Sequence, residues 1–406
     1  MIRKVIGYLL LFFLLYYDYI HIGPIKLSHL WKVLLFFYLL YIVFKHKLPR
    51  KVSKFLVIGF ITSLSIFYNA NLVLGISGDI TFFLDLISIP LFVAYFYICV
   101  LYKKYVEVES FILNISIFVI LSNIPFLIGW LEPKGVVDVG YDSKGFGVKV
   151  FGVFNNASGA SKIFAISSII VFAYFKRFWN GGIIKKVFWV VLTIVGFLSV
   201  IYSFARTGWV IYILGFLILF LYKSSIKTKF VAFLLFLVVV PIIASIFSNN
   251  VELYNRLIGK KENKAYVVGD YNRISSGRGD LYMHSIDIFN EMTLMEKLMG
   301  IGTYGALEKM RLKTRTRTFS HNRILELLLV GGVFTLFLYV FYLKSIIKLT
   351  INKFHNKENL IKRLPITLLI LFLISLIPSH GFGFYSNVLF SGVIVLNQKY
   401  KYEVSS

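Results

Sequence analysis

The sequence predicts an all-α, polytopic integral membrane protein with about twelve transmembrane helices and one long extracytoplasmic loop that carries an amphipathic helix. Of its 406 residues, 58% are hydrophobic and only 16% are charged, whereas soluble domains carry about 25% charged residues. Apolar runs recur at lengths near the roughly 20 residues that cross a bilayer, with short charged breaks between them. Residues 1–406 are therefore expected to form a single membrane domain.

Hydropathy places the spans in order along the chain. The first follows Met-Ile-Arg-Lys and resembles a secretory signal, but residues 18–21 offer no small-residue cleavage site, so it is interpreted as an uncleaved span. The predicted spans are residues 5–22, 28–44, 55–70, 82–102, 110–130, 158–175, 187–204, 207–222, 230–247, 323–343, 364–379 and 384–398.

Basic residues in alternate turns predict the orientation of these spans. Clusters such as Lys45-His46-Lys47 and the run 344–363 fall on one side, while the short turns 71–81 and 380–383 carry no Lys or Arg. Short cytoplasmic turns are the basic ones in membrane proteins, so both termini are predicted to be cytoplasmic. The same rule, together with anionic lipid headgroups, explains the formal charge of +25 without nucleic acid as a partner.

Two predicted outer segments, residues 131–157 and the longer 248–322, are basic as well. Long loops translocate largely regardless of charge, so their cations need another explanation. An anionic ligand outside the cytoplasm is the direct one. Contact with anionic lipid headgroups is the alternative.

The long loop contains one apolar stripe at helical spacing. It predicts an amphipathic helix on the membrane surface, formed by Leu281, Ile288, Met292, Met295 and Met299. Arg278 stands at the start of this helix, where backbone N–H groups favour anions, and is a candidate phosphate ligand. Pairing with Asp280 or simple solvation is the alternative.

The loop ends in a basic run that leads through Ser320-His321-Asn322 into an apolar helix. Lys309, Arg311, Lys313, Arg315 and Arg317 belong to this run. Such cations must face water or an anion. Because the imidazole of His321 and the guanidinium of Arg323 follow them closely in the sequence, this stretch is predicted to form the entrance of a catalytic site. Interfacial anchoring by the cations and a capping role for the histidine remain the alternative.

Arg206 joins two apolar runs with almost no loop between them. A charge at that place must face the bundle interior or a wet cavity, and the orientation rule disfavours Arg in an outer turn. A functional role is therefore favoured over a purely topological one.

Two further sequence features concern a dinucleotide site and a disulfide framework. Gly300-Ile-Gly302-Thr-Tyr-Gly305 fits a dinucleotide fingerprint, but it lies between an amphipathic segment and a basic loop instead of between a strand and a helix. Cys99 is the single cysteine and lies in an apolar run, which excludes a disulfide framework.

Four motifs in order resemble the O-antigen ligase and O-antigen polymerase superfamily of bacterial membrane glycosyltransferases. They cover roughly residues 145–345 and include two departures: alanine where serine is usual, and an aromatic one place early. The motifs are Gly152-Val-Phe154-Asn155-Asn156 before a helix, Ala205-Arg206-Thr207-Gly208, Arg278 with Gly300-Ile301-Gly302-Thr303-Tyr304-Gly305, and His321-Asn322 with Gly331-Gly332.

This resemblance implies an inverting, metal-independent glycosyltransferase without a cofactor, at the outer leaflet of the bacterial inner membrane. The donor would be a glycan on undecaprenyl diphosphate and the acceptor a sugar hydroxyl or lipid A core. A chain-length regulator and a flippase are candidate partners. Its implied catalytic residues are His321, Arg206 and Arg278, and its implied substrate-binding residues are Asn322, Arg323, Arg315, Arg317, Asn155, Asn156 and Tyr304.

The residue chemistry fits this reaction. A departing lipid diphosphate needs charge stabilisation, which arginines supply with a fork of donors suited to phosphate oxygens. The acceptor hydroxyl needs a base, and histidine titrates near neutral pH. His284 in the amphipathic helix is a rival to His321.

The motifs do not separate a polymerase from a ligase, and polymerase is preferred. A flippase for lipid-linked sugars would also need cations near a pyrophosphate. The absence of an inverted hydropathy repeat and the concentration of cations in one outer loop disfavour it. A membrane scaffold is the third reading, and it would tolerate replacement of His321 and Arg206.

We predict that reporter fusions will place both termini and residues 345–362 in the cytoplasm and residues 250–320 outside it, because the basic short turns fix the orientation. Alkaline phosphatase and fluorescent-protein fusions after each turn measure this. A cytoplasmic signal from residues 250–320 would contradict the prediction.

Overall fold

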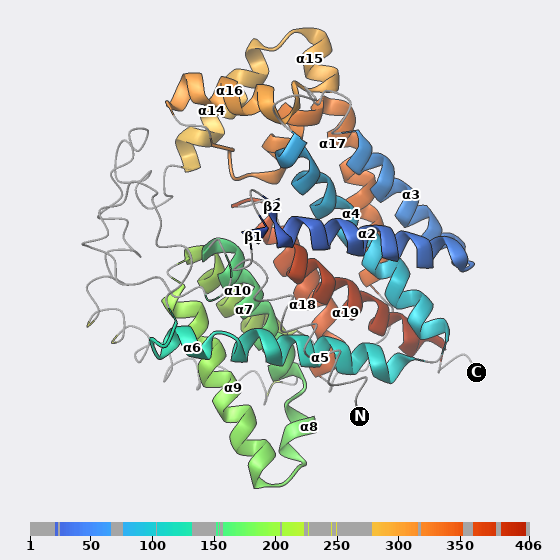
Figure 1. The fold of residues 1–406 in the computed structure, drawn as a ribbon, viewed down its shortest axis with the longest axis vertical. Coiled ribbons are helices and arrows are strands. Elements are labelled where there is room, and N and C mark those ends of the chain that lie inside the picture. Colours follow the sequence, from blue (N-terminus) through green and yellow to red (C-terminus); the bar gives the residue numbers. More distant parts are fainter. Residues whose placement is uncertain are drawn as a thin grey trace.

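The computed structural model describes residues 21–22, 25–65, 76–102, 104–131, 152, 154, 157–203, 205–222, 226, 245, 249, 278–315, 318–351, 360–378 and 383–402. Within these ranges the regular secondary structure is helical apart from a hairpin of two short strands, β1 (His21–Ile22) and β2 (Ile25–Lys26). Figure 1 shows the helices α2 (Leu27–Lys45), α3 (Arg50–Leu64), α4 (Ile76–Leu101), α5 (Tyr105–Leu121), α6 (Ile124–Leu127), α7 (Ala157–Ala173), α8 (Phe175–Trp179), α9 (Ile183–Tyr202), α10 (Arg206–Leu221), α14 (Arg278–Glu291), α15 (Leu294–Met299), α16 (Gly302–Thr314), α17 (Arg323–Thr350), α18 (Leu360–Ser375) and α19 (Phe384–Tyr402).

The predicted all-α fold is confirmed for the described residues, with helices at ten predicted spans. The predicted spans 5–22 and 230–247 lie almost entirely outside those residues, so the count of twelve stays a prediction. Among the described residues, four stretches are long and apolar enough, by length and composition, to cross a membrane: Phe83–Leu101, Val106–Leu127, Ile183–Tyr202 and Arg323–Thr350. Shorter apolar helices, including Ala157–Ala173 and Arg206–Leu221, pack among them.

Helix α7 lies at the centre of the bundle, with almost all of its residues buried. Small residues allow its neighbours to approach closely. A Cβ atom on Gly208 of α10 would clash with Ser161, and one on Gly215 would clash with Ile169. Because both contacts advance in the same direction along the two chains, α7 and α10 run parallel and begin at the same end of the bundle.

Helix α17 is two helical pieces. Gly332 interrupts it with φ 68° and ψ −172°. The side chains of Arg323 and Tyr339 nevertheless line one small pocket, although a straight helix would separate these residues by about 24 Å along its axis. The chain therefore folds back at Gly332, and we call residues 323–331 the folded-back half-helix.

This geometry corrects the predicted span 323–343. Only residues 333–350, about 27 Å long at helical rise, form a piece of spanning length. The sequence suggested one uninterrupted helix because residues 324–343 are apolar throughout, apart from Glu326. The two adjacent glycines marked the break.

The turn between α15 and α16 docks onto the fold-back. Ile301 donates its backbone N–H to the Leu329 carbonyl at 2.8 Å. A Cβ atom on Gly300 would clash with the Val330 carbonyl, and one on Gly332 would clash with the Leu298 carbonyl and the Gly300 nitrogen. The Gly300-Ile301-Gly302 motif thus serves backbone-to-backbone packing, which explains it without a nucleotide.

The described end of the long loop contains three helices, and the prediction of one amphipathic helix is wrong. Helix α14 ends at Glu291, and Thr293 opens α15 with a capping box that it shares with Glu296. Leu281, Ile288 and Met292 are buried against the protein, whereas Met295 is 69% exposed. The stripe therefore breaks at the α14–α15 turn, and its first part faces α16 and α17 instead of a membrane surface.

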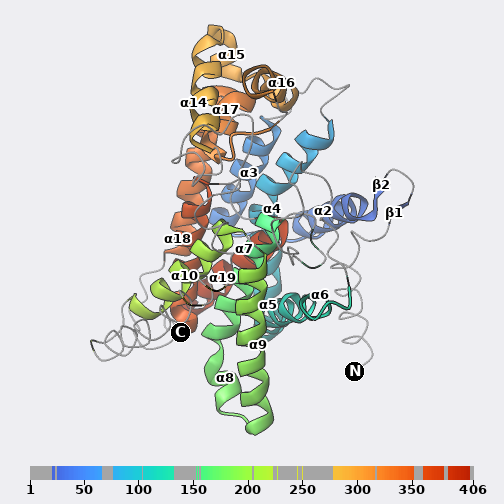
Figure 2. The ribbon, with the colours of Figure 1, turned by 90° about the vertical axis from the view of Figure 1, so that its left-hand side faces the viewer.

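The segment predicted as a basic loop is largely helix α16, which ends at Thr314. Figures 1 and 2 show α14, α15 and α16 together at one end of the molecule, with the basic helix α8 at the opposite end. An arrangement with these two regions on opposite sides of a membrane is compatible with the predicted orientation.

We predict that Gly332→Ala destabilises the protein by about 1–3 kcal/mol through its backbone conformation alone, because only glycine readily adopts it. The added methyl group would also meet backbone atoms of the α15–α16 turn. The melting temperature of purified protein in detergent measures the effect. Gly182→Ala is the matched control, since Gly182 has φ −62° and open space around its Cβ position. Equal melting temperatures for the two variants would contradict this account of the fold-back.

Candidate functional site

The folded-back half-helix begins inside the protein. Its N-cap is Asn322, whose side-chain oxygen accepts hydrogen bonds from the backbone N–H groups of Ile324 at 3.0 Å and Leu325 at 3.2 Å. The preceding residue, His321, is half-buried and has φ 57°, a left-handed conformation uncommon outside glycine. Because the cap occupies the side chain of Asn322, the structure gives this residue a role in helix initiation.

The backbone N–H of Arg323 donates to the Leu376 carbonyl at 2.9 Å, just beyond the C-terminus of α18. The Arg323 side chain is 2% exposed and lines a pocket with Asp85, Tyr339, Tyr342 and Asn387. This guanidinium therefore points into the helical bundle.

Arg278 approaches the same region from the long loop. It is the first residue of α14, and Tyr282, one turn later, donates its hydroxyl to the Ile377 carbonyl at 2.8 Å. The turn after α18 thus holds both the start of α14 and the start of the folded-back half-helix. Arg278 and His321 are brought to one end of the bundle by this shared support.

Arg206 belongs to one of the apolar helices of the bundle. It is the first residue of α10, and its Nε and Nη1 atoms are buried. Because α10 runs parallel to α7 and touches Ser161 through Gly208, Arg206 lies near the beginning of α7. The burial of these two atoms is compatible with the expectation that this arginine faces the bundle interior or a wet cavity.

Three charged residues of this region are absent from the sequence-based site. Lys162 on α7 is 5% exposed, Glu326 on the folded-back half-helix is 1% exposed, and Asp85 on α4 is partly buried. Lys162 interacts electrostatically with Asp85, Glu326 and Arg278. An ionisable residue inside an apolar span is a signal for a functional site, and that signal is present in the sequence at Lys162 and Asp85.

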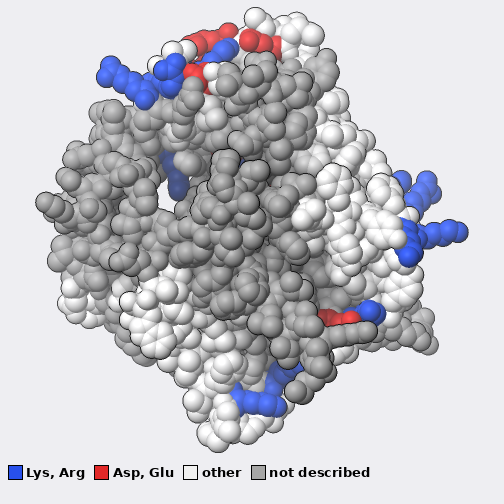
Figure 3. All heavy atoms as spheres, in the orientation of Figure 1, with Lys and Arg blue, Asp and Glu red and all other residues white. Residues whose placement is uncertain are grey.

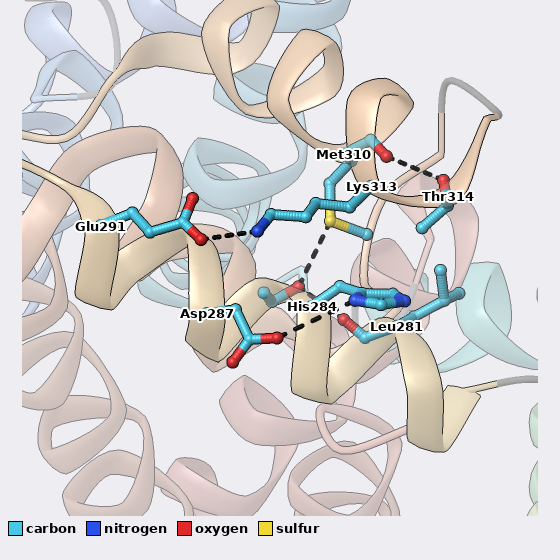
Figure 4. Close-up of polar contacts among 8 residues, drawn as sticks. Leu281, His284, Asp287, Glu291, Met310, Lys313 and Thr314 are labelled. Carbon is cyan, nitrogen blue, oxygen red and sulfur yellow. Dashed lines mark hydrogen bonds and ion pairs between the residues drawn. The ribbon is translucent and has the colours of Figure 1, made fainter.

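The cations of the basic run form a different group. Arg311 pairs with Glu308 at 2.7 Å, Lys309 pairs with Glu296 at 3.7 Å, and Lys313 pairs with Glu291. The hydrogen bond to Glu291 raises the pKa of the Lys313 ammonium above its ordinary value. Figure 3 shows blue and red side chains gathered at this end of the molecule, and Figure 4 shows the Lys313–Glu291 pair.

The pairs of Lys309 and Lys313 join α16 to α15 and α14, whereas the Arg311–Glu308 pair lies within α16. Exposed pairs of this kind contribute little to stability. Lys309, Arg311 and Lys313 therefore have carboxylate partners on the surface, which corrects their predicted place in a catalytic mouth. Arg315 is exposed, has φ 60° and ends α16. Tyr304 is partly buried on α16.

His284 belongs to this surface group as well. Its Nδ1 atom lies 3.9 Å from a carboxylate oxygen of Asp287 on the same helix, and Figure 4 shows the two side chains facing each other. His321, in contrast, lies at the start of the folded-back half-helix beside buried Arg323. His321 as the site histidine, with His284 as its rival, stays a prediction.

Asn155, Asn156 and Arg317 lie outside the described residues. Their neighbour Phe154 packs edge-on against Phe164 of α7, with ring centroids 5.6 Å apart. Among the described residues, no group of three or more His, Cys, Asp or Glu side chains is arranged to hold a metal ion.

Comparison with known proteins bears on the same region. No curated protein and no solved structure matches the chain. Residues 188–340 match the family model described as O-antigen ligase, a stretch that includes Arg206, Arg278, His321 and the fold-back at Gly332. Members of this family are glycosyltransferase-like enzymes that act on lipid-linked glycans and acceptors. Over these residues the chain is similar to the O-antigen ligase family, and its apolar helices are those of an integral membrane protein.

Proposed function

We propose that the protein is a polymerase of O-antigen or a similar surface polysaccharide. It transfers a glycan from undecaprenyl diphosphate to a sugar hydroxyl at the outer leaflet of the bacterial inner membrane. The observation that carries this proposal is the shared support of the segments that begin with Arg278 and follow His321 by the turn after α18. Arg206, with its Nε and Nη1 atoms buried at the start of α10, is proposed to complete the site. The three residues come from a membrane helix, the long loop and the folded-back half-helix, all within the matched residues.

The proposed reaction is a single displacement. The imidazole of His321 takes the proton of the acceptor hydroxyl, whose oxygen attacks the anomeric carbon of the donor. The bond between that carbon and the diphosphate oxygen breaks with its electron pair, and undecaprenyl diphosphate departs. Attack from the face opposite the leaving group inverts the anomeric configuration.

Arg206 and Arg278 stabilise the charge that develops on the departing diphosphate. Their guanidinium groups present parallel donors that match phosphate oxygens. The site lies beside apolar helices, and partial exclusion of water strengthens such interactions. In this proposal the cations supply the stabilisation, and no metal ion or other cofactor is required.

Transfer to lipid A core is the second candidate. A ligase and a polymerase share the donor, the base and the arginines and differ in the acceptor. Expression in a polymerase-deleted host and, separately, in a ligase-deleted host distinguishes them through the glycan ladder on a gel. A ladder restored only in the ligase-deleted host would overturn the assignment as a polymerase.

A flippase for the same lipid-linked glycan is the candidate from another class. It would move the donor across the membrane without consuming it. Purified protein in liposomes, supplied with donor and acceptor on the outer face, separates the classes because a transferase releases undecaprenyl diphosphate there. Movement of donor without that product would support the flippase.

We predict that Arg206→Ala and Arg278→Ala each lower turnover by about 10²–10³, the usual cost of removing one strong donor to a developing charge. Lysine at either position should restore only part of the activity, because a point charge lacks the bidentate geometry. Turnover per mole of membrane-inserted protein is the measurement. Arg311→Ala is the matched control, since Arg311 is exposed and paired with Glu308. Unchanged turnover in both site variants would rule out the proposed diphosphate contacts.

We predict that His321→Gln abolishes transfer and leaves donor binding largely intact, because the amide retains hydrogen bonding but cannot take the proton. His284→Ala, at the surface pair with Asp287, should have a much smaller effect. Single-turnover transfer and donor binding are measured separately for each variant. An active His321→Gln enzyme would exclude the general-base role, and failed donor binding would assign His321 to the phosphate site.

A further inference from the structure

The hydroxyl of Tyr282 ties the start of α14 to the membrane helices. It donates a hydrogen bond to the backbone carbonyl of Ile377 at 2.8 Å, across 95 positions of the sequence. Ile377 belongs to residues 376–378, the turn after α18. The carbonyl just before it, that of Leu376, accepts the backbone N–H of Arg323 at 2.9 Å. Adjacent carbonyls of one turn therefore hold two segments that are distant in the sequence.

Arg278 and Tyr282 share one face of α14. Arg278 is the first residue of this helix and Tyr282 is the fifth, and side chains four positions apart on a helix lie one above the other. The Arg278 side chain therefore leaves α14 on the side that is bonded to Ile377, one turn nearer the start of the helix. The Tyr282 hydrogen bond fixes the direction of that side.

The remaining contacts of α14 are of a different kind. Leu281 and Ile288 are buried against the protein, and the Ser285 hydroxyl lies 3.7 Å from the Met310 sulfur of α16. Apolar packing is not directional, whereas a hydrogen bond weakens steeply when its angle changes. The Tyr282 hydroxyl thus adds a directional contact to a helix that is otherwise packed through apolar side chains.

Helix α18 relates this turn to Arg206. Near the start of α18, Arg363 donates from its Nη1 atom to the carbonyls of residues 219 and 220 of α10, both at 3.1 Å. Farther along α18, Leu371 lies against Gly215 of α10, where an added Cβ atom would come within 3.0 Å of its side chain. The two helices therefore run antiparallel. The start of α10, with Arg206, lies at the same end as the turn after α18.

We propose that Tyr282 is a positioning residue of the donor site: its hydroxyl holds Arg278 at the end of α18 where α10 places Arg206, so that both guanidinium groups meet one diphosphate. The inference rests on the proposed function, in which the two arginines contact the departing diphosphate. Arginine binds phosphate oxygens through a fork of fixed geometry. The position of each fork therefore decides whether both can donate at once, and Tyr282 acts through Arg278 without touching the donor.

Tyr282→Phe removes one oxygen atom and keeps the ring. We expect turnover to fall about two- to tenfold, the usual effect of losing one hydrogen bond of this kind, with the amount of membrane-inserted protein unchanged. Tyr102→Phe is the matched control, because the Tyr102 hydroxyl is hydrogen-bonded to His46 Nδ1 at 2.7 Å, away from the candidate site. Equal turnover in Tyr282→Phe and the parent protein would overturn the proposal.

A double variant distinguishes positioning from general support of the fold. If Tyr282 acts through the Arg278 side chain, Tyr282→Phe causes no further loss in a protein that already carries Arg278→Ala, because the two effects are then not additive. Single-turnover transfer with a labelled donor and excess enzyme measures the residual activity. The same fold-loss in both backgrounds would make Tyr282 a purely structural residue and overturn the proposal.

A labelling experiment tests the position of Arg278 without requiring activity. Cys99→Ser removes the single cysteine, Arg278→Cys supplies a reporter thiol, and a water-soluble maleimide measures its accessibility in purified protein in detergent. We expect Tyr282→Phe in this background to raise the labelling rate several-fold, because the start of α14 is then no longer held to Ile377. Tyr102→Phe again serves as the control, and a rate equal to that of the control would overturn the proposal.

The proposed function and the positioning role can fail separately. Full transfer by Arg278→Ala, combined with faster labelling in Tyr282→Phe, would refute the diphosphate contact although the hydroxyl holds α14. An inactive Arg278→Ala enzyme, combined with unchanged labelling in Tyr282→Phe, would refute the positioning role and leave the diphosphate contact intact.

Discussion

The site depends on the backbone contact of Gly300 in the α15–α16 turn with Val330 and Gly332 of α17. At this place main-chain atoms of the long loop pack directly against main-chain atoms of a membrane helix. Side chains would keep the two backbones apart, and the conformation of Gly332 is almost closed to other residues. The contact reverses α17 and returns its first residues into the bundle.

Reversal of α17 explains how charged residues come to lie in an apolar structure. Arg323 and Glu326 are carried inward, where an isolated charge would be strongly destabilising. Asp85 from α4 and Lys162 from α7 provide charges of the opposite sign. The polar interior is therefore built from several elements, each of which places one ionisable group in an otherwise apolar helix.

The outer surface is built differently. Helices α14, α15 and α16 carry most of their charges in exposed pairs, such as Arg311 with Glu308. Such pairs contribute little to stability, but they give the basic run of α16 a structural explanation. The distinction between paired surface cations and buried interior cations separates the residues proposed for chemistry from those that link the outer helices.

Composition and hydropathy by themselves determined that this is a helical membrane protein, and local motifs identified Arg206, Arg278 and His321 as residues of interest. Those features depend on neighbours in the sequence, which is why they are readable from it. Tertiary structure decided that α17 folds back, that Leu281, Ile288 and Met292 face protein instead of lipid, and that Lys162 and Glu326 are buried. Hydropathy reports the preference of a segment for an apolar surrounding, but lipid and protein interior satisfy that preference equally well. Only the packing of segments distant in sequence distinguishes the two and pairs one buried charge with another.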